Sequence, residues 1–234
     1  MILLVSQVSR AAEPLRIAVN HIEGMLEEHN NEAPYTEILT HLQQGTSGSV
    51  SYFYYPGSRA SKAFNEHEVD CLFPSSLGVH NEKSRLIESL AFNTAKAYFI
   101  GYEEYRTESL LLPRQRPVMI AYRRGNTFGG RIEELVHQAL VEVNSDSQAK
   151  LLLDKGRVDV MLVYLPDAMH LINQQKTPAL IYTDASHFYS QNDSMLCHDS
   201  QGASRFITTI NERLAKMQDS GALKRILSKA YIQP

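Results

Sequence analysis

The sequence predicts an α/β protein built from two similar lobes, and three observations support this prediction. Strand-like and helix-like segments alternate along the chain, and the order βαβαβ occurs once in each half. Both blocks end alike, with a helix, a tight turn and a Val-Asp strand, at Val69-Asp70 and at Val158-Asp159. A chain of 234 residues is also long enough for two modest lobes.

Composition and charge narrow the classes of partner. The chain is 43% hydrophobic and 21% charged, which is typical of an ordinary globular protein. Its net charge is only −3, and Lys and Arg are interspersed among Asp and Glu, so no basic face is evident that could neutralise a run of phosphates. We therefore expect no nucleic-acid partner.

The two cysteines suggest neither a metal site nor redox chemistry. Cys71 and Cys197 lie far apart and form no Cys-x-x-Cys or zinc-ligand spacing. Cys71 lies in an apolar strand, where a free thiol behaves as a small hydrophobe. We expect two buried free thiols, with a single disulfide as the alternative, and neither a metal nor a cofactor.

The first block contains three predicted strands and two predicted helices. In chain order they are a strand from Leu15, a helix over 35–44, a strand over 49–55, a helix over 59–66 and a strand over 69–73. Pro56-Gly57 separates the second strand from the second helix, and Ser58 is predicted to be the N-cap of that helix.

The second block repeats this order and a helical tail follows it. Its predicted elements are a strand over 118–122, an amphipathic helix through Ile132, Leu135, Val136 and Ala139, a strand over 140–143, a helix from Ser145 to Gly156 and a strand over 158–163. The tail has Ile207, Ile210, Leu214 and Met217 on one helix face, a break at Ser220-Gly221 and a last short helix.

Parallel strands predict where a ligand would bind. Ligands of open parallel sheets collect outside the carboxyl ends of the strands. The segments there are 20–23, 56–59, 74–78, 123–127 and 164–167. Two lobes that face each other would form a cleft between these segments.

Several segments in this order resemble bacterial extracellular solute-binding proteins of the amino-acid type. They are 15–20, the helix-to-turn segment 57–76, 98–102, the loop 123–128, the second Val-Asp unit at 154–159 and the closing helices from 210 to 231. The resemblance implies a type II periplasmic-binding fold, in which residues 13–105 and 197–234 form a discontinuous first lobe and 106–196 the second. A hinge of two crossing segments would join the lobes and close them on a ligand.

The resemblance also implies a role and a location. It predicts a monomeric periplasmic protein that captures a small polar solute, amino-acid-like or another charged metabolite, for an ABC transporter. Residues 1–12 end in the small-x-small sequence Ser9-Arg10-Ala11, which is typical of a signal-peptidase site, so we expect a signal-peptide remnant there.

The first lobe supplies four candidate ligand-binding residues beyond its third strand. Ser75 and Ser76 fall where the family uses hydroxyl and N–H groups to hold the ligand, although a helix cap or turn explains them equally well. A little further on the family places an arginine that pairs with the α-carboxylate, whereas this chain has Lys83, and then Arg85.

The second lobe supplies four more candidates. Asn126 and Thr127 match a loop that contributes hydrogen-bond donors at a helix start. The family then carries an acidic residue for the ammonium group, but this chain has Tyr164 at that spacing and Asp167 three residues later. These departures argue against a standard α-amino acid as the ligand.

Two further candidates lie in the first lobe, and two other functions remain open. Glu23 could meet a cationic group, although a solvated loop carboxylate is the commoner explanation, and Tyr55 lies at a strand end where it could face the cleft. A ligand-sensing partner of a membrane receptor would use the same cleft. A dehydratase-like enzyme would use Glu23 and Asp167 as acid or base, yet no catalytic motif is present, so we predict a binder.

Overall fold

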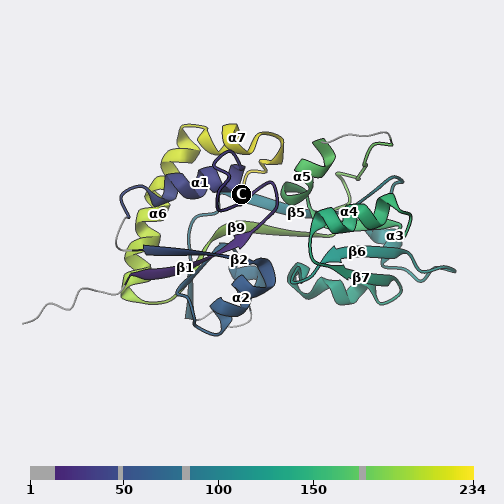
Figure 1. Ribbon diagram of the computed structural model, residues 1–234, viewed down its shortest axis with the longest axis horizontal. Helices are drawn as coiled ribbons and strands as arrows, with labels where there is room; N and C mark the ends of the chain where they lie inside the picture. The colour runs from purple at the N-terminus through teal and green to yellow at the C-terminus, as the bar shows by residue number, and fades with distance from the viewer. Residues whose placement is uncertain (1–13, 47–49, 81–84, 174–177) are drawn as a thin grey trace, which may run out of the picture.

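The computed structural model describes residues 14–46, 50–80, 85–173 and 178–234, which fold into two α/β lobes side by side (Figure 1). The segment 1–12, for which a signal-peptide remnant is predicted, lies outside the described residues. Among the described residues, no helix is both long and apolar enough to cross a bilayer.

The first lobe has the predicted order of strands and helices. Its elements are β1 (Leu15–His21), α1 (Pro34–Gln43), β2 (Val50–Pro56), α2 (Gly57–Asn65), β3 (Cys71–Ser75), η1 (Leu77–Val79) and β4 (Leu86–Glu88). β1 pairs in parallel with both β2 and β3. The βαβαβ prediction for this half of the chain is confirmed.

The second lobe repeats the pattern, and the chain then returns to the first lobe. The elements are β5 (Asn93–Gly101), α3 (Thr107–Leu110), β6 (Met119–Arg123), η3 (Phe128–Leu135), β7 (Ala139–Val143), α4 (Asp146–Asp154), β8 (Val160–Tyr164), α5 (Leu165–Asn173), β9 (Tyr189–His198), α6 (Gln201–Asp219), α7 (Ala222–Leu227) and η4 (Ser228–Ala230). β6 pairs in parallel with β7 and β8.

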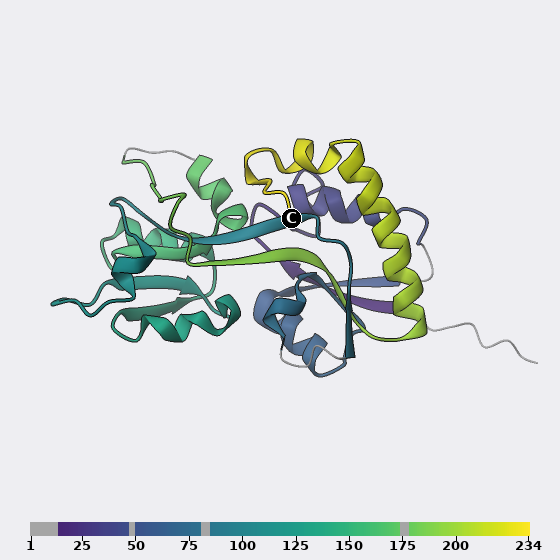
Figure 2. The same ribbon diagram turned by 180° about the vertical axis from the view of Figure 1, so that it is seen from behind.

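Two long antiparallel strands join the lobes (Figure 2). The sheet order is β2-β1-β3-β9-β5-β8-β6-β7, with β4 beside β9. The first half of β9 pairs with β5, whereas its last residues pair with β3 and β4. β5 likewise pairs with β9 along its first half and with β8 along its second. The predicted two-segment hinge is therefore present, while the predicted lobe boundaries, 13–105 with 197–234 and 106–196, stay a prediction.

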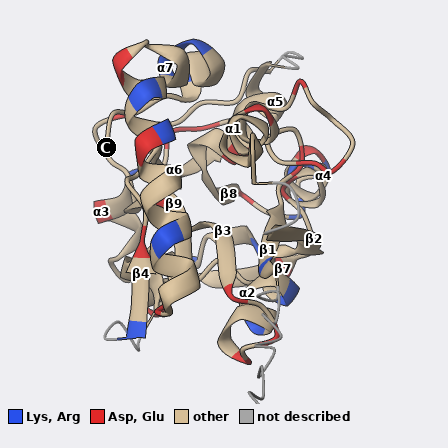
Figure 3. Ribbon diagram, turned by 90° about the vertical axis from the view of Figure 1, so that its left-hand side faces the viewer, with Lys and Arg blue, Asp and Glu red and all other residues tan. Residues whose placement is uncertain are grey.

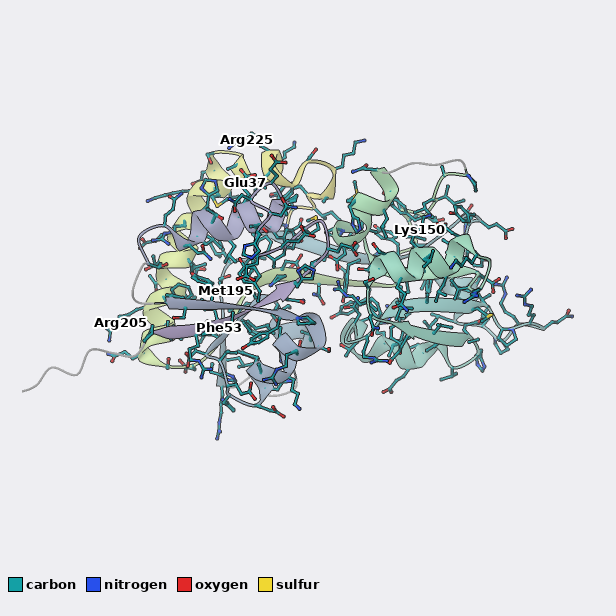
Figure 4. All side chains as sticks on the ribbon, in the orientation of Figure 1. Glu37, Phe53, Lys150, Met195, Arg205 and Arg225 are labelled. Atoms are coloured by element: carbon teal, nitrogen blue, oxygen red, sulfur yellow. A yellow bond between two sulfur atoms is a disulfide. The ribbon has the colours of Figure 1, made fainter. Side chains whose placement is uncertain are left out.

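Apolar side chains fill the space between the sheet and its helices. In the first lobe α1, α6 and α7 cover one face and α2 covers the other. The predicted face of α6 is buried there, at Ile207, Ile210, Leu214 and Met217. Figure 4 shows Met195 of β9 inside this lobe, whereas Arg205 and Arg225 project from its surface. In Figure 3, Lys and Arg alternate with Asp and Glu along α6, so this face carries no single-signed charge.

Helix starts depend on residues that the sequence identified only in part. The Ser145 hydroxyl accepts a hydrogen bond from the Gln148 N–H at 3.1 Å, so the predicted cap of α4 is confirmed. α2, however, begins at Gly57 rather than after Ser58, and Pro56 precedes it without a side-chain cap. Pro56 takes the cap position with a non-helical ψ of 145°, so the helix starts two residues earlier than a cap at Ser58 would place it.

The amphipathic helix predicted through Ile132 and Ala139 is wrong. The chain instead forms the 3₁₀ segment η3, which is kinked where Gly129 and Gly130 take positive φ values of 64° and 86°. Val136, predicted to face the core, is 74% exposed, and Ala139 already belongs to β7. Both glycines precede Ile132, so they account for the kink in η3, whereas the predicted helix is cut short because residues 139–143 pair with β6 as β7.

The expectation of two free thiols is also wrong. Cys71 and Cys197 lie directly opposite each other on the antiparallel strands β3 and β9, and their sulfurs form a disulfide. The bond joins residues 126 positions apart. The sequence does not show that these strands are neighbours, because β9 returns from the second lobe to pair with β3.

We predict that removing this disulfide lowers the free energy of unfolding by about 3 to 5 kcal/mol, because the bond restricts a long loop in the unfolded chain. Denaturant unfolding of the wild type with and without reductant measures the difference. The double variant Cys71→Ala/Cys197→Ala serves as the control, since reductant should leave it unchanged. Equal unfolding midpoints for the oxidised and reduced wild type would contradict the prediction.

Candidate functional site

The two lobes touch at loops that follow parallel strands. Gly125, after β6, lies so close to α2 that a Cβ atom on it would be 3.3 Å from the Cβ of Ser58. Gly24, after β1, lies against α5, where a Cβ would be 2.9 Å from the Cβ of His170. Both glycines have positive φ, so a larger residue is disfavoured by conformation and by space. A cavity of about 370 Å³ beside His170 is lined by residues of both lobes.

Arg123 occupies the centre of a buried charge cluster at this interlobe face. Its side chain, at the end of β6, is only 12% exposed. Nη2 lies 3.1 Å from Asp167 Oδ2, and Nη1 lies 3.4 Å from Asp146 Oδ2. Burial opposes the charge on Arg123, but the two carboxylates outweigh burial and raise its pKa. The guanidinium is therefore a permanent cation between two acids.

The surroundings of the acids near Arg123 disfavour their ionised forms. Burial raises the pKa of Asp167 to about 7; Arg123 opposes this shift, while Asp146 and Asp193 add to it. Burial also raises the pKa of Asp146, to which Glu23 contributes and which Arg123 and His170 oppose. One guanidinium does not fully compensate the carboxylates gathered around it.

A second polar network ties the hinge strands to α1 and the C-terminus. The Tyr35 hydroxyl donates to Asp193 Oδ2 at 2.5 Å, and Asn93 Nδ2 donates to the Tyr35 oxygen at 2.9 Å. The N–H of Ile232 donates to Asn93 Oδ1 at 2.9 Å. Burial raises the pKa of Asp193 to about 7, although hydrogen bonds from Tyr35 and Gln191 favour its ionised form.

Four buried polar atoms at the interlobe face have no hydrogen-bond partner among the residues that the structure describes. They are Asn20 Oδ1 in the first lobe, and Asn126 Nδ2, Asp146 Oδ1 and His170 Nε2 in the second. Asn20 lies beside Gly57, next to the Ser58 that contacts Gly125. Most buried polar atoms in native proteins have a partner, so a group of unpaired ones contributed by both lobes indicates a ligand position.

Four of the predicted site residues lie in or beside the Arg123 cluster. Asp167 pairs with Arg123, and Asn126 Oδ1 accepts a hydrogen bond from Arg123 Nη2 at 3.5 Å. Tyr164 donates to Gln191 Oε1 at 3.0 Å and lies close enough to Asp167 for that charge to affect it. Glu23 is half-buried near Asp146.

The remaining first-lobe candidates lie apart from this cluster. Ser76 caps η1 by accepting a hydrogen bond from the Gly78 N–H, and Ser75 Oγ contacts His80 Nε2 at 3.1 Å. Tyr55 packs below the guanidinium of Arg59, 5.7 Å from it. Arg85 lines a cavity to which only first-lobe residues contribute.

The two remaining candidates are Thr127 and Lys83. Thr127 follows Asn126 but is exposed. Lys83 lies outside the described residues.

Sequence reasoning did not single out five residues of the candidate site, namely Asn20, Arg123, Asp146, His170 and Asp193. Arg123 was inside a candidate loop but was not singled out, and Asp146 was hidden behind the Ser145 cap. Asp193 lies in β9, which the sequence analysis did not predict. The available signal was a charged residue at a strand end or inside an apolar run, since charges are rarely buried without a partner.

Comparisons with known proteins show the fold. No protein-family profile and no curated protein matches the sequence. The GluR0 ligand-binding core from Nostoc punctiforme in complex with L-glutamate is 14% identical with a TM-score of 0.73, over 93% of this chain and 99% of that one. An amino acid ABC transporter substrate-binding protein, AbpA, from Streptococcus pneumoniae bound to L-arginine is 14% identical with a TM-score of 0.67, over 93% and 94%.

A third similar structure is that of an ancestral protein. The ancestral amino acid-binding protein AncCDT-1, a precursor of cyclohexadienyl dehydratase, is 16% identical with a TM-score of 0.69, over 94% of this chain and 96% of that one. Together these likenesses establish that the chain has the type II periplasmic-binding fold, as predicted. At this identity they show the fold alone.

We predict that Arg123→Met destabilises the protein by about 3 to 5 kcal/mol at pH 7.5, because it leaves two buried carboxylates without their cation. The neighbouring Arg124 is the matched control. It pairs with Glu142 at 3.2 Å, but both side chains are exposed, so Arg124→Met should cost at most about 1 kcal/mol. Chemical denaturation measures the free energy of unfolding of both variants. Equal losses for the two would show that the buried ion pairs of Arg123 contribute no more to stability than the exposed pair of Arg124.

The Asp193 carboxyl gives a pH prediction. Its folded-state pKa of about 7 lies above the unfolded value near 4, so the folded protein binds the proton more tightly. Its contribution to stability is therefore present at low pH and is lost as pH rises from about 4 to 7.

Asp193→Asn should match the wild type near pH 5 and exceed its free energy of unfolding at pH 8 by about 2 to 3 kcal/mol. The asparagine oxygen can still accept from Tyr35. Denaturant unfolding at both pH values measures the effect, with Asp199→Asn on the surface as control. A difference that does not change with pH would contradict the raised pKa.

Proposed function

We propose that this chain is a solute-binding protein that holds a small polar solute between its lobes. The observation that carries the proposal is the set of unpaired buried polar atoms at the interlobe face, contributed by Asn20 from one lobe and by Asn126, Asp146 and His170 from the other. A solute with complementary donors and acceptors would satisfy them, and only when the lobes are closed.

The hinge supports the same proposal. β5 and β9 are the strands shared by both lobes, so a change in their twist would move one lobe relative to the other without breaking either core. Proteins with this fold and such a hinge include the amino-acid-binding neighbours described above. We extend the proposal to periplasmic capture by a monomer for an ABC transporter, with delivery to a membrane sensor as the alternative use of the same cleft.

One observation favours a second candidate, a dehydratase-like enzyme. Asp167 and Asp193 have pKa values of about 7, and a carboxyl near neutrality can act as a general acid or base. Structural ion networks perturb pKa values as well, and both acids are already engaged, Asp167 by Arg123 and Asp193 by Tyr35. We therefore place binding ahead of catalysis.

A thermal-shift screen against amino acids, polyamines, organic acids and small peptides tests the proposal. A solute at about 100 times its Kd should raise Tm by about 5 to 10 °C, because it binds only the folded state. Asn126→Ala should weaken that solute roughly fivefold or more, since it removes a buried donor. Asn192→Ala, an exposed asparagine on β9, is the control and should not change the affinity.

Two outcomes would count against the binder. If no compound in the screen raises Tm, the proposal of solute binding fails. If a compound is instead consumed on incubation and Asp167→Asn stops its consumption, the enzyme is the better account.

A further inference from the structure

The buried cluster holds more negative than positive charge. Asp146, Asp167 and Asp193 are 4 to 5% exposed, and Arg123 is the cation that contacts the first two. Glu23, from the first lobe, adds a further acid near Asp146. Transfer of uncompensated carboxylates out of water is costly, so they are stabilised either by taking up a proton, as the raised pKa values of Asp167 and Asp193 indicate, or by a further positive charge when the site is filled.

One carboxylate oxygen shows where that charge would go. Asp146 Oδ2 faces Arg123, but Asp146 Oδ1 is buried and has no hydrogen-bond partner. This residue is at the first position of α4, in the second lobe. Besides Arg123, the titratable groups that interact electrostatically with Asp146 are Asp167, Glu23 and His170, and Glu23 comes from the opposite lobe. The unpaired oxygen therefore belongs to the interlobe face.

Another unpaired buried atom nearby is also a hydrogen-bond acceptor. Asn20 Oδ1 is a second buried acceptor without a donor, and it lies in the first lobe. Arg123 already donates to Asp167 and Asn126, so its guanidinium is engaged within the protein. A molecule that enters here meets two unpaired acceptors, an unpaired donor at Asn126 Nδ2 and surplus acid, so a net anion would be repelled.

We propose that the bound solute is a net cation, whose guanidinium or amine group donates to Asp146 Oδ1. This inference rests on the proposed function and names the class of solute. Among the described residues, no three His, Cys, Asp or Glu side chains converge closely enough to hold a metal ion.

Isothermal titration of the intact chain with paired probes tests the charge requirement. L-Arginine and L-citrulline have nearly the same shape, but only arginine carries a side-chain cation, and agmatine retains that cation without a carboxylate. We expect arginine or agmatine to bind at least about tenfold more tightly than citrulline. If citrulline or L-glutamate binds as tightly as the cations, or if neither cation binds, the inference is wrong.

Two acid-to-amide variants locate the charge. Asp146→Asn should weaken the bound cation at least about tenfold, since it removes the carboxylate. Glu142→Gln, an exposed acid on the same lobe, is the control and should not alter the affinity. Citrulline binding or thermal unfolding shows that each variant is folded. Unchanged cation affinity in a folded Asp146→Asn variant would overturn the assignment, whereas the proposed function fails only if no solute in the wider screen binds.

Discussion

The antiparallel pairing of β5 with β9 is the contact on which the arrangement of the lobes depends. Half of each strand lies in one lobe and half in the other, so the same two strands hold both lobes together. Asp193, Tyr35 and Asn93 lock these strands to α1 at the crossing point. The disulfide holds the far end of β9 to β3 within the first lobe. Rigid lobes and a narrow shared hinge are what allow a cleft to open and close.

Electrostatics decides what that cleft can hold. Arg123 neutralises part of the acid around it, but burial still pushes the pKa values of Asp167 and Asp193 up to about 7. For these two acids, burial therefore raises the pKa by more than the ion pair and the hydrogen bonds lower it. A solute that brings a positive charge would relieve this imbalance, which is why the same cluster bears on stability, on pH dependence and on the choice of ligand.

Periodicity predicted the fold better than it predicted the site. The repeated βαβαβ order and the buried face of α6 follow from local patterns that the sequence displays. The Cys71–Cys197 bond and the Asp193 network depend on β9, whose partners are set by the return of the chain and not by its neighbours in sequence. Apolar spacing favoured a helix through Ile132 and Ala139, but Ala139 already pairs with β6 as the first residue of β7. Asn126 and Asp167, predicted because they come after strands, lie beside Arg123, whereas Arg85 lines a different cavity; their role in ligand binding stays a prediction.

Closure of the lobes over a solute is the central claim, and an interlobe distance tests it most directly. Spin labels at Lys62 on α2 and Glu133 on η3 report across the cleft, since both positions are exposed and lie in different lobes. The account predicts a broad, longer distance distribution for the free chain and a shorter, narrow one with saturating agmatine. An identical distribution with and without a solute that binds would contradict it.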